Sequence, residues 1–320
     1  MLLEIRDLSV EFASMQGSVK AIKNVSFSVD KGEIIGIVGE SGSGKSVTAL
    51  TILGLLEKNA SVTSGSILYK GRDVRIMNKK QQQALRGKEI GMVFQEPMTA
   101  LHPTMKIGDQ LAEVISRHRN LPSREAYKLG IQSLSEVHIH EPELVARKYP
   151  FELSGGMRQR VVIALAMAAP PDLLIADEPT TALDVTIQFE ILKLMEELSV
   201  NRGTSIMFIT HDLGIVAQMC KRVMVMYAGE VVETGETAQV LQNPVHPYTR
   251  ALIGALPDLA DPDQLLHAIP GDSPDLRNRP AGCVYASRCA QALPLCREDH
   301  PVLEPVNPQN ENHHAACWVR

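Results

Sequence analysis

Residues 33–46 read Glu-Ile-Ile-Gly-Ile-Val-Gly-Glu-Ser-Gly-Ser-Gly-Lys-Ser, and this stretch decides the fold. Its first part, residues 33–38, is a short apolar run next to glycine, typical of a fully buried strand. Its second part, residues 39–46, matches the pattern G-x-x-x-x-G-K-[ST], and a helical pattern follows over residues 46–56. Glycines let successive backbone N–H groups turn toward one anion, and the start of a helix adds partial positive charge. The stretch predicts a phosphate-binding loop in which Lys45 reaches the β- and γ-phosphates and Ser46 ligates Mg²⁺.

The rest of the chain alternates strand and helix patterns. Apolar–polar alternation over residues 3–29 predicts half-buried strands with a turn near residues 15–18. Buried strands are expected at 173–176 and 205–209, helices at 187–198 and 213–219, and a hairpin over 223–233. Residues 97–165 have a helical pattern, with helices over 107–119 and 123–137. Strands that alternate with helices predict an α/β fold with a parallel sheet.

Charge and composition argue against a nucleic-acid-binding protein and against a membrane-spanning protein. The chain has 320 residues, 32 Lys and Arg and 37 Asp and Glu, and its net charge of −5 disfavours non-specific binding to nucleic acid. Aromatic residues make up only 4%, which disfavours a base-stacking platform. No apolar run approaches the 18 or so residues of a membrane span, and residues 1–10 do not resemble a signal peptide. We therefore expect a cytosolic protein that reaches a membrane only through a partner.

A second acidic motif completes the phosphate site. Residues 173–178 read Leu-Leu-Ile-Ala-Asp-Glu, an apolar strand that ends in two carboxylates. A parallel strand presents such a carboxylate at the sheet edge where ligands bind. We expect Asp177 to hold Mg²⁺ and Glu178 to polarise an attacking water.

Residues 153–160, Leu-Ser-Gly-Gly-Met-Arg-Gln-Arg, resemble the signature sequence of ATP-binding-cassette (ABC) ATPases. Ser154 can cap a helix whose free N–H groups form a second anion site. In that family the signature closes on the ATP held by a partner cassette, so the resemblance implies a pair of cassettes that enclose two ATP molecules. The residues that match it are Leu153, Ser154, Gly155, Gly156 and Met157.

Other motifs of this family occur in the same order. Phe12 lies where the family places an aromatic ring on adenine, although the pattern fits a core residue of a strand equally well. Gln95 resembles the Q-loop glutamine, Asp184 the D-loop aspartate and His211 the switch histidine. Over residues 1–235 the resemblance implies a nucleotide-binding domain with a RecA-like core, an antiparallel β subdomain and a helical subdomain at about 97–165. It assigns ATP binding to Phe12, Gly39, Glu40, Ser41, Gly42, Ser43, Gly44, Lys45, Ser46 and Asp177, catalysis to Glu178, His211 and Gln95, and Mg²⁺ binding to Ser46, Gln95 and Asp177.

Three features resemble one branch of the family, the ATPase subunits of dipeptide, oligopeptide and nickel-type importers. They are Met157 in the signature, residues 94–103 around the Q-loop, and residues 243–252, Asn-Pro-Val-His-Pro-Tyr-Thr-Arg-Ala-Leu, which open a C-terminal extension over 236–320. The resemblance implies two transmembrane permease subunits, a second ABC ATPase subunit (a copy or a paralogue) and an extracytoplasmic solute-binding protein as partners. It implies a peripheral protein on the cytoplasmic face of the bacterial inner membrane, with a cargo of di- or oligopeptide, nickel chelate or opine.

The extension carries four of the five cysteines and, from about residue 257, many prolines, so we expect a loop-rich appendage. Disulfides are not expected in the cytosol, and the spacing C-x₅-C-x₆-C-x₂₀-C is longer than in common zinc sites. A [4Fe–4S] cluster, which the resemblance also implies, is the favoured ligand, with Zn²⁺ as the alternative. The expected ligands are Cys283, Cys289, Cys296 and Cys317, any of which His300, His313 or His314 could replace, whereas Cys220 is expected to serve packing.

Three other classes of protein with a phosphate loop are alternatives. A soluble cassette ATPase of DNA repair or translation often carries two cassettes or a coiled coil, which this sequence lacks. A small-molecule kinase would need neither the signature nor His211. An exporter cassette is commonly fused to membrane spans, and none is evident here.

Overall fold

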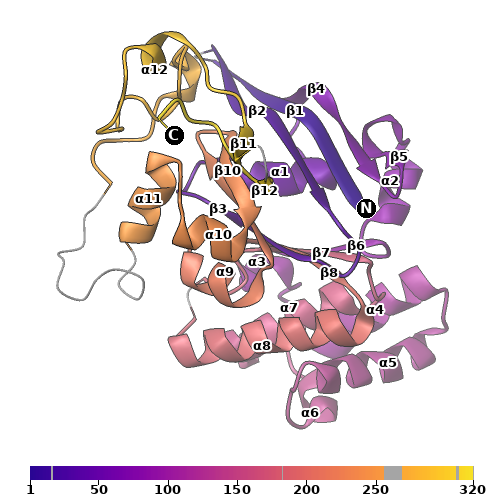
Figure 1. Cartoon of the computed structure of the whole chain (residues 1–320). Coiled ribbons are helices and arrows are strands. Elements are labelled where there is room, and N and C mark those ends of the chain that lie inside the picture. The colour runs from indigo at the N-terminus through magenta and orange to yellow at the C-terminus, as the bar shows by residue number, and fades with distance from the viewer. Residues whose placement is uncertain (16, 182, 256–268, 308–309, 320) are drawn as a thin grey trace. The chain divides into compact units, whose positions relative to one another are not determined.

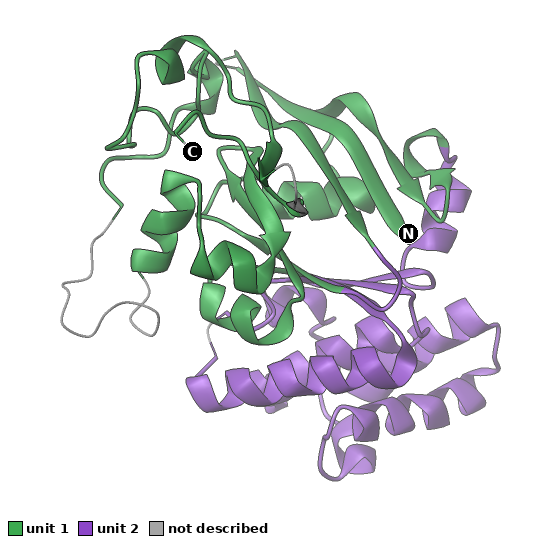
Figure 2. Cartoon of the chain, viewed as in Figure 1, with its two compact units in different colours: residues 1–29, 34–76, 208–320 green, residues 30–33, 77–207 purple. Residues whose placement is uncertain are grey.

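The computed structural model describes residues 1–15, 17–181, 183–255, 269–307 and 310–319. The chain forms two compact units, shown in different colours in Figure 2. Unit 1 comprises residues 1–29, 34–76 and 208–320, and unit 2 comprises residues 30–33 and 77–207. Ala182 of the D-loop and part of the expected loop-rich region, residues 256–268, lie outside the described residues. Unit 1 holds both the phosphate loop and the C-terminal extension, and the domain boundary at 235/236 stays a prediction.

The first sheet of unit 1 is antiparallel. Its strand order is β2-β1-β4-β5, with β1 (Leu3–Ser14), β2 (Gly17–Val29), β4 (Ala60–Tyr69) and β5 (Arg72–Asp73). Alternating residues of β1, among them Leu3, Ile5 and Val10, are fully buried, so the half-buried strand pair predicted from the alternation is confirmed. Strand β4 was not predicted, because serines and Gly65 interrupt its apolar pattern, and β5 was not predicted because it has only two residues, both charged.

The second sheet runs through the phosphate loop and the extension. Within unit 1 its order is β11-β12-β10-β9-β3, with β3 (Ile34–Val38), β9 (Arg222–Tyr227), β10 (Glu230–Glu236), β11 (Glu304–Asn307) and β12 (Asn310–Ala315). Strand β3 is parallel to β9, and the β9–β10 hairpin matches the prediction. Strand β12 lies beside β10 (Figure 1) and pairs with it antiparallel. His314 lies opposite Thr234 in this pairing. The expectation of a loop-rich appendage is therefore incomplete, because the extension adds strands to this sheet.

The helices of unit 1 flank these strands. They are α1 (Lys45–Ile52), α9 (Leu213–Met219), α10 (Thr237–Gln242), α11 (Pro247–Gly254) and α12 (Leu295–Glu298), with 3₁₀ turns η1 (Val74–Ile76) and η3 (Leu276–Asn278). Helix α9 matches the predicted range. Helix α1 is shorter than the predicted 46–56, because Gly54 turns the chain with a φ of +61° two residues after the helix ends.

Unit 2 is mainly helical. Its parallel strands are β6 (Ile90–Val93) and β7 (Leu173–Asp177), and β8 (Ser205–Thr210) begins in this unit. Its helices are α2 (Lys79–Leu85), α3 (Pro97–Ala100), α4 (Ile107–Arg119), α5 (Ser123–Glu136), α6 (Pro142–Ala146), α7 (Gly155–Met167) and α8 (Val185–Arg202), with the 3₁₀ turn η2 (Pro150–Glu152). A Cβ on Gly108 would lie 2.7 Å from the ring of Tyr127, so α4 and α5 pack closely at that glycine. The predicted strand at 173–176 and the helices at 107–119 and 123–137 are confirmed within one residue at each end.

Among the described residues we find no helix whose length and apolarity would let it cross a membrane.

Candidate functional site

The phosphate loop joins β3 to α1 in unit 1. A Cβ on Gly39 would lie 2.1 Å from the carbonyl oxygen of Met226, so only glycine fits there. Lys45, the first residue of α1, is buried, and its Nζ donates to the carbonyl oxygens of Gly39 (2.7 Å) and Glu40 (3.0 Å). Gly44, the residue before the helix, has no side chain that could cap the first N–H groups of α1. This helix start and the buried lysine have the chemistry of an anion site.

Ser43 gives independent evidence for a ligand at this loop. Its hydroxyl is buried, and Oγ has no hydrogen-bond partner among the described residues. A buried polar atom without a partner is costly, so such atoms often mark a bound ligand or water. The phosphate loop predicted from residues 39–46 therefore has both its backbone shape and a polar group suited to a phosphate.

The extension contacts this loop at Glu40. The Glu40 N–H donates to Tyr248 Oη at 2.8 Å, and Arg288 donates to both carboxylate oxygens of Glu40, at 2.8 and 3.1 Å. Arg288 is 248 residues from Glu40 in the chain. The sequence did not predict this contact, because no motif links the two residues and they lie far apart in the chain.

Glu178 lies directly after β7 in unit 2 and is held by two donors. Gln95 Nε2 donates to Glu178 Oε2 at 3.1 Å, and Thr181 Oγ1 donates to the same oxygen at 2.9 Å. The backbone of Glu178 has a φ of +46°, an unusual conformation for a residue with a side chain, and such strain concentrates at functional sites. Asp177, the last residue of β7, is buried. The structure thus brings the predicted Gln95 and Glu178 together and adds Thr181, which the motifs did not predict.

The signature residues start helix α7. Ser154 is its N-cap, and the Met157 N–H donates to Ser154 Oγ at 3.3 Å, so the predicted cap is confirmed. A Cβ on Gly156 would lie 2.8 Å from Ile187, so this glycine lets α7 approach α8. Asp184 caps α8 in the same way, accepting from the Ile187 N–H at 3.0 Å.

The predicted ATP-site residues are divided between the two units. The phosphate loop, Phe12 and His211 belong to unit 1. Phe12 is a half-buried residue of β1 opposite Val19, and His211 is exposed directly after β8. The remaining predicted residues, which include Gln95, the signature, Asp177, Glu178 and Asp184, belong to unit 2.

The four cysteines of the extension lie in unit 1, and a backbone hydrogen bond joins two of them. The Cys283 N–H donates to the carbonyl oxygen of Cys296 at 2.8 Å. Burial raises the pKa of Cys283 to about 11, and the charges of the other three thiols raise it further. Burial likewise raises the pKa of Cys289 and of Cys317, with a contribution from Cys296 in each case. Burial therefore favours the protonated, neutral form of these three thiols.

A metal site itself is not confirmed. Among the residues that the structure describes, no group of three or more His, Cys, Asp or Glu side chains is arranged to hold a metal ion. Two of the histidines named as substitute ligands have carboxylate partners instead: His300 Nε2 lies 2.6 Å from Glu230, and His313 Nε2 lies 2.8 Å from Glu233. Cys220 is buried, and burial raises its pKa to about 12, which agrees with its predicted packing role.

Two family models match the sequence. The ABC transporter model matches residues 22–181, and the model of the oligopeptide/dipeptide transporter C-terminal region matches residues 232–296. Among curated proteins, the oligopeptide transport ATP-binding protein OppD of Bacillus subtilis is 48% identical over 99% of this chain and 88% of its own. The dipeptide transport ATP-binding protein DppD of Lactococcus lactis is 47% identical over 99% of this chain and 90% of its own.

Solved structures of cassettes have a similar fold. A dimeric ATP-binding cassette in a post-hydrolysis state, bound to ADP and Pi, matches with a TM-score of 0.67 and 26% identity over 74% of this chain and 99% of its own. The cassette cbiO1 of Clostridium perfringens, part of an ABC transporter complex, matches with a TM-score of 0.64 and 30% identity over 76% of this chain and 91% of its own.

Proposed function

The chain belongs to the ABC transporter family, as an ATP-binding subunit of its peptide-transporting branch, and from this premise we propose how its residues serve peptide import. It is an ABC ATPase that acts as the motor subunit of a peptide importer. The proposal is that ATP binding and hydrolysis at a pair of cassettes drive uptake of di- or oligopeptides through two permease subunits. A solute-binding protein would deliver the peptide, and the ATPase would sit on the cytoplasmic face of the inner membrane.

The observation that carries the proposal is the phosphate loop. Its buried Lys45 and the unpartnered hydroxyl of Ser43 lie where the backbone of residues 39–44 turns into α1. Lys45→Ala should weaken binding of a fluorescent ATP analogue strongly, whereas Lys58→Ala, a change of an exposed lysine of the same unit, should not. Unchanged ATP affinity in Lys45→Ala would contradict the assignment.

We assign the role of general base to Glu178. Gln95 and Thr181 orient its carboxylate by donating to one oxygen, and such orientation is what water activation requires. Glu178→Gln should retain ATP binding and lose about 10²–10⁴-fold in hydrolysis rate. Glu143→Gln, a change of an exposed glutamate of α6, is the matched control. Normal turnover by Glu178→Gln would show that another group activates the water.

Magnesium binding stays a prediction. The expected donors are Ser46 in unit 1 and Gln95 and Asp177 in unit 2, and these oxygen ligands suit Mg²⁺. When bound, Mg²⁺ would neutralise phosphate charge. The chain's own contribution is to hold oxygen donors at the ends of β7 and α1. Asp177→Asn should raise the Mg²⁺ concentration needed for ATP binding.

The transport partners are tested by extraction of the chain from its native membranes in mild detergent without oxygen. Mass spectrometry should identify two multi-span permeases, with or without a second cassette. Ribosomal or DNA-repair proteins in their place would overturn the proposal. Uptake of labelled di- and oligopeptides by cells that carry Glu178→Gln as their single copy should stop, and this result would connect ATP hydrolysis to the cargo.

We also propose that Cys283, Cys289, Cys296 and Cys317 hold a [4Fe–4S] cluster with a structural role. The support is the donor set: four cysteines lie between residues 283 and 317, a backbone hydrogen bond joins Cys283 to Cys296, and cysteine is the usual ligand of such clusters. Iron and acid-labile sulfide of the anaerobically purified chain should be present in equal amounts and fall in Cys289→Ser, while Cys220→Ser keeps both. Zinc instead of iron, or neither metal, would overturn this assignment.

A further inference from the structure

The phosphate loop of this chain carries a negatively charged side chain, that of Glu40. Glu40 follows Gly39 in the loop, and its carbonyl oxygen accepts from Lys45 Nζ at 3.0 Å. A negative side chain beside the phosphates would repel them unless a cation offsets it. In the structure that cation comes from the extension: the guanidinium of Arg288 makes a bidentate pair with Glu40, at 2.8 and 3.1 Å.

Other groups besides Glu40 also hold the Arg288 side chain in place. Its side chain is only 6% exposed, and its Nε donates to the carbonyl oxygen of Pro270 at 2.8 Å. One of its NH groups also donates to Tyr227 Oη at 3.2 Å, and the guanidinium lies 5.7 Å from the centre of that ring. Fully exposed ion pairs contribute little, but this pair is bidentate and partly buried, with Glu40 27% exposed, so we expect it to contribute more.

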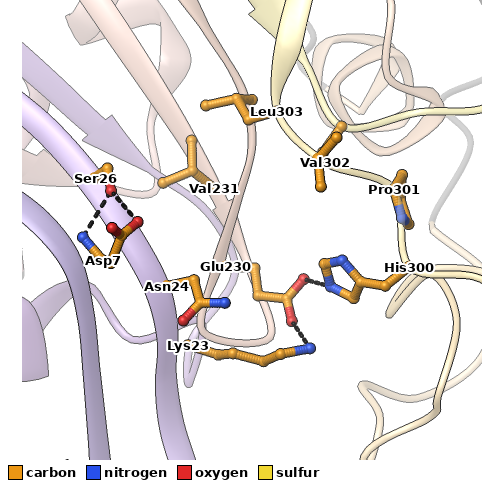
Figure 3. A pocket seen from close by; sticks show the side chains of 11 residues that line it. Asp7, Lys23, Asn24, Ser26, Glu230, Val231, His300, Pro301, Val302 and Leu303 are labelled. Atoms are coloured by element: carbon orange, nitrogen blue, oxygen red, sulfur yellow. Dashed lines mark hydrogen bonds and ion pairs between the residues drawn. The ribbon is translucent and has the colours of Figure 1, made fainter. Parts of the chain in front are cut away.

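A second arginine of the extension supports the other end of the loop. Arg279 donates to Glu230 and to the carbonyl oxygen of Ala228, in the turn between β9 and β10. The next residue in that turn, Gly229, donates its N–H to the carbonyl oxygen of Ser43 at 3.0 Å. Figure 3 shows Glu230 between His300 of the extension and Lys23 of β2, at the wall of a cavity of about 360 Å³. The extension therefore reaches the phosphate loop at Glu40 and, through the hairpin turn, at Ser43.

We propose that Arg288 is a positioning residue for ATP binding: it neutralises Glu40 and holds the phosphate loop in its binding conformation. The inference rests on the proposed role of residues 39–46 in binding ATP. If Arg288 has this role, the C-terminal extension contributes a residue to the nucleotide site, and this contribution is separate from any role of its cysteines. ATP should depend on Arg288 more than ADP does, because ATP brings more negative charge to the loop.

The test is a double-mutant cycle of Arg288→Gln and Glu40→Gln. For each variant, Kd is measured for ATP and for ADP, and kcat and KM are measured for ATP hydrolysis. Arg288→Gln should raise Kd and KM for ATP about fivefold to thirtyfold, with a smaller change for ADP and little change in kcat. In the Glu40→Gln background, Arg288→Gln should raise the Kd for ATP less than about twofold, because residue 40 then carries no negative charge for the arginine to offset. Arg277→Gln is the matched control, since Arg277 pairs with Asp275 at 2.9 Å on the exposed surface of the same extension.

Two outcomes would overturn the inference. Equal losses in both Glu40 backgrounds would mean that Arg288 only packs against its neighbours. No loss in either background would mean that the pair does not affect ATP binding. Lys45→Ala, measured in parallel, separates this failure from failure of the proposed function: if ATP binding survives Lys45→Ala, the loop itself is wrongly assigned.

Discussion

Glu233 of β10 is fully buried, and its removal should destabilise unit 1. Glu233 Oε1 accepts from the Val245 N–H at 2.8 Å, and Oε2 accepts from the His246 N–H at 2.9 Å. His313 Nε2 of β12 lies 2.8 Å from Oε1. One carboxylate thus joins the hairpin, the entry of α11 and the strand that the extension adds to the sheet.

The size of the effect follows from these partners. Glu233→Ala leaves two backbone N–H groups and an imidazole without their acceptor, and each buried unsatisfied group costs about 1–3 kcal/mol. Three groups lose their acceptor, so we expect the free energy of unfolding to fall by about 3–9 kcal/mol. Helix α11 also carries Tyr248, which contacts the phosphate loop at Glu40, so ATP affinity should fall as well.

The chain's single tryptophan makes the measurement direct. Trp318 lies in the extension, and its Nε1 donates to the carbonyl oxygen of Asp299 at 3.0 Å. Urea unfolding followed by Trp318 fluorescence should show a midpoint shift with an unchanged slope. Glu298→Ala, a change of an exposed glutamate of α12, is the control. A shift in Glu233→Ala no larger than in this control would refute the reasoning.

Three further predictions concern pH, packing and capping. Burial lowers the pKa of His246 to about 4, whereas the same imidazole in the unfolded chain has a pKa near 6.5. As the pH falls from 6.5 to 4, the unfolded chain therefore binds a proton that the folded chain does not, and the free energy of unfolding should fall by about 3 kcal/mol. His246→Gln should flatten this pH profile of the urea midpoint. Gly36→Ala places a Cβ 2.7 Å from Val216 and should cost about 1–3 kcal/mol in thermal or urea unfolding, and an unshifted midpoint would contradict that packing. Ser154→Ala removes the cap of the Met157 N–H and should cost about 1 kcal/mol, whereas a larger loss in ATPase than in stability would indicate a role at a partner's nucleotide.

Buried strands and the phosphate loop could be predicted because their signals are local. Strand β7 is an unbroken apolar run of four residues before Asp177, and residues 39–46 need only their own glycines and lysine. Helices α4 and α9 match their predicted ranges because apolar residues recur at helical spacing within each. The Ser154 cap could also be predicted, because a serine at a helix start bonds to an N–H group only a few residues away.

The remaining features depend on partners far along the chain. Strand β12 reads Asn-Glu-Asn-His-His-Ala, which has no apolar alternation, and His313 is buried there with Glu233, 80 residues away. The pair of Arg288 and Glu40 likewise has no sequence signal. The cysteine spacing predicted a metal or cluster site, but the described residues form no group arranged to hold a metal ion, because spacing along the chain does not fix how side chains meet.

The contacts of the extension bear on how ATP binding and folding are linked. A segment with a small core needs anchors outside itself, and this one is anchored at Glu40, Glu230 and Glu233. The first of these lies in the phosphate loop. If Arg288 favours the loop conformation that binds ATP, then bound ATP must favour the attached extension by the same factor, because coupling between two sites is reciprocal. Saturating ATP should therefore slow hydrogen exchange in the extension near Arg288, and this protection should vanish in Arg288→Gln while the protection of α1 remains.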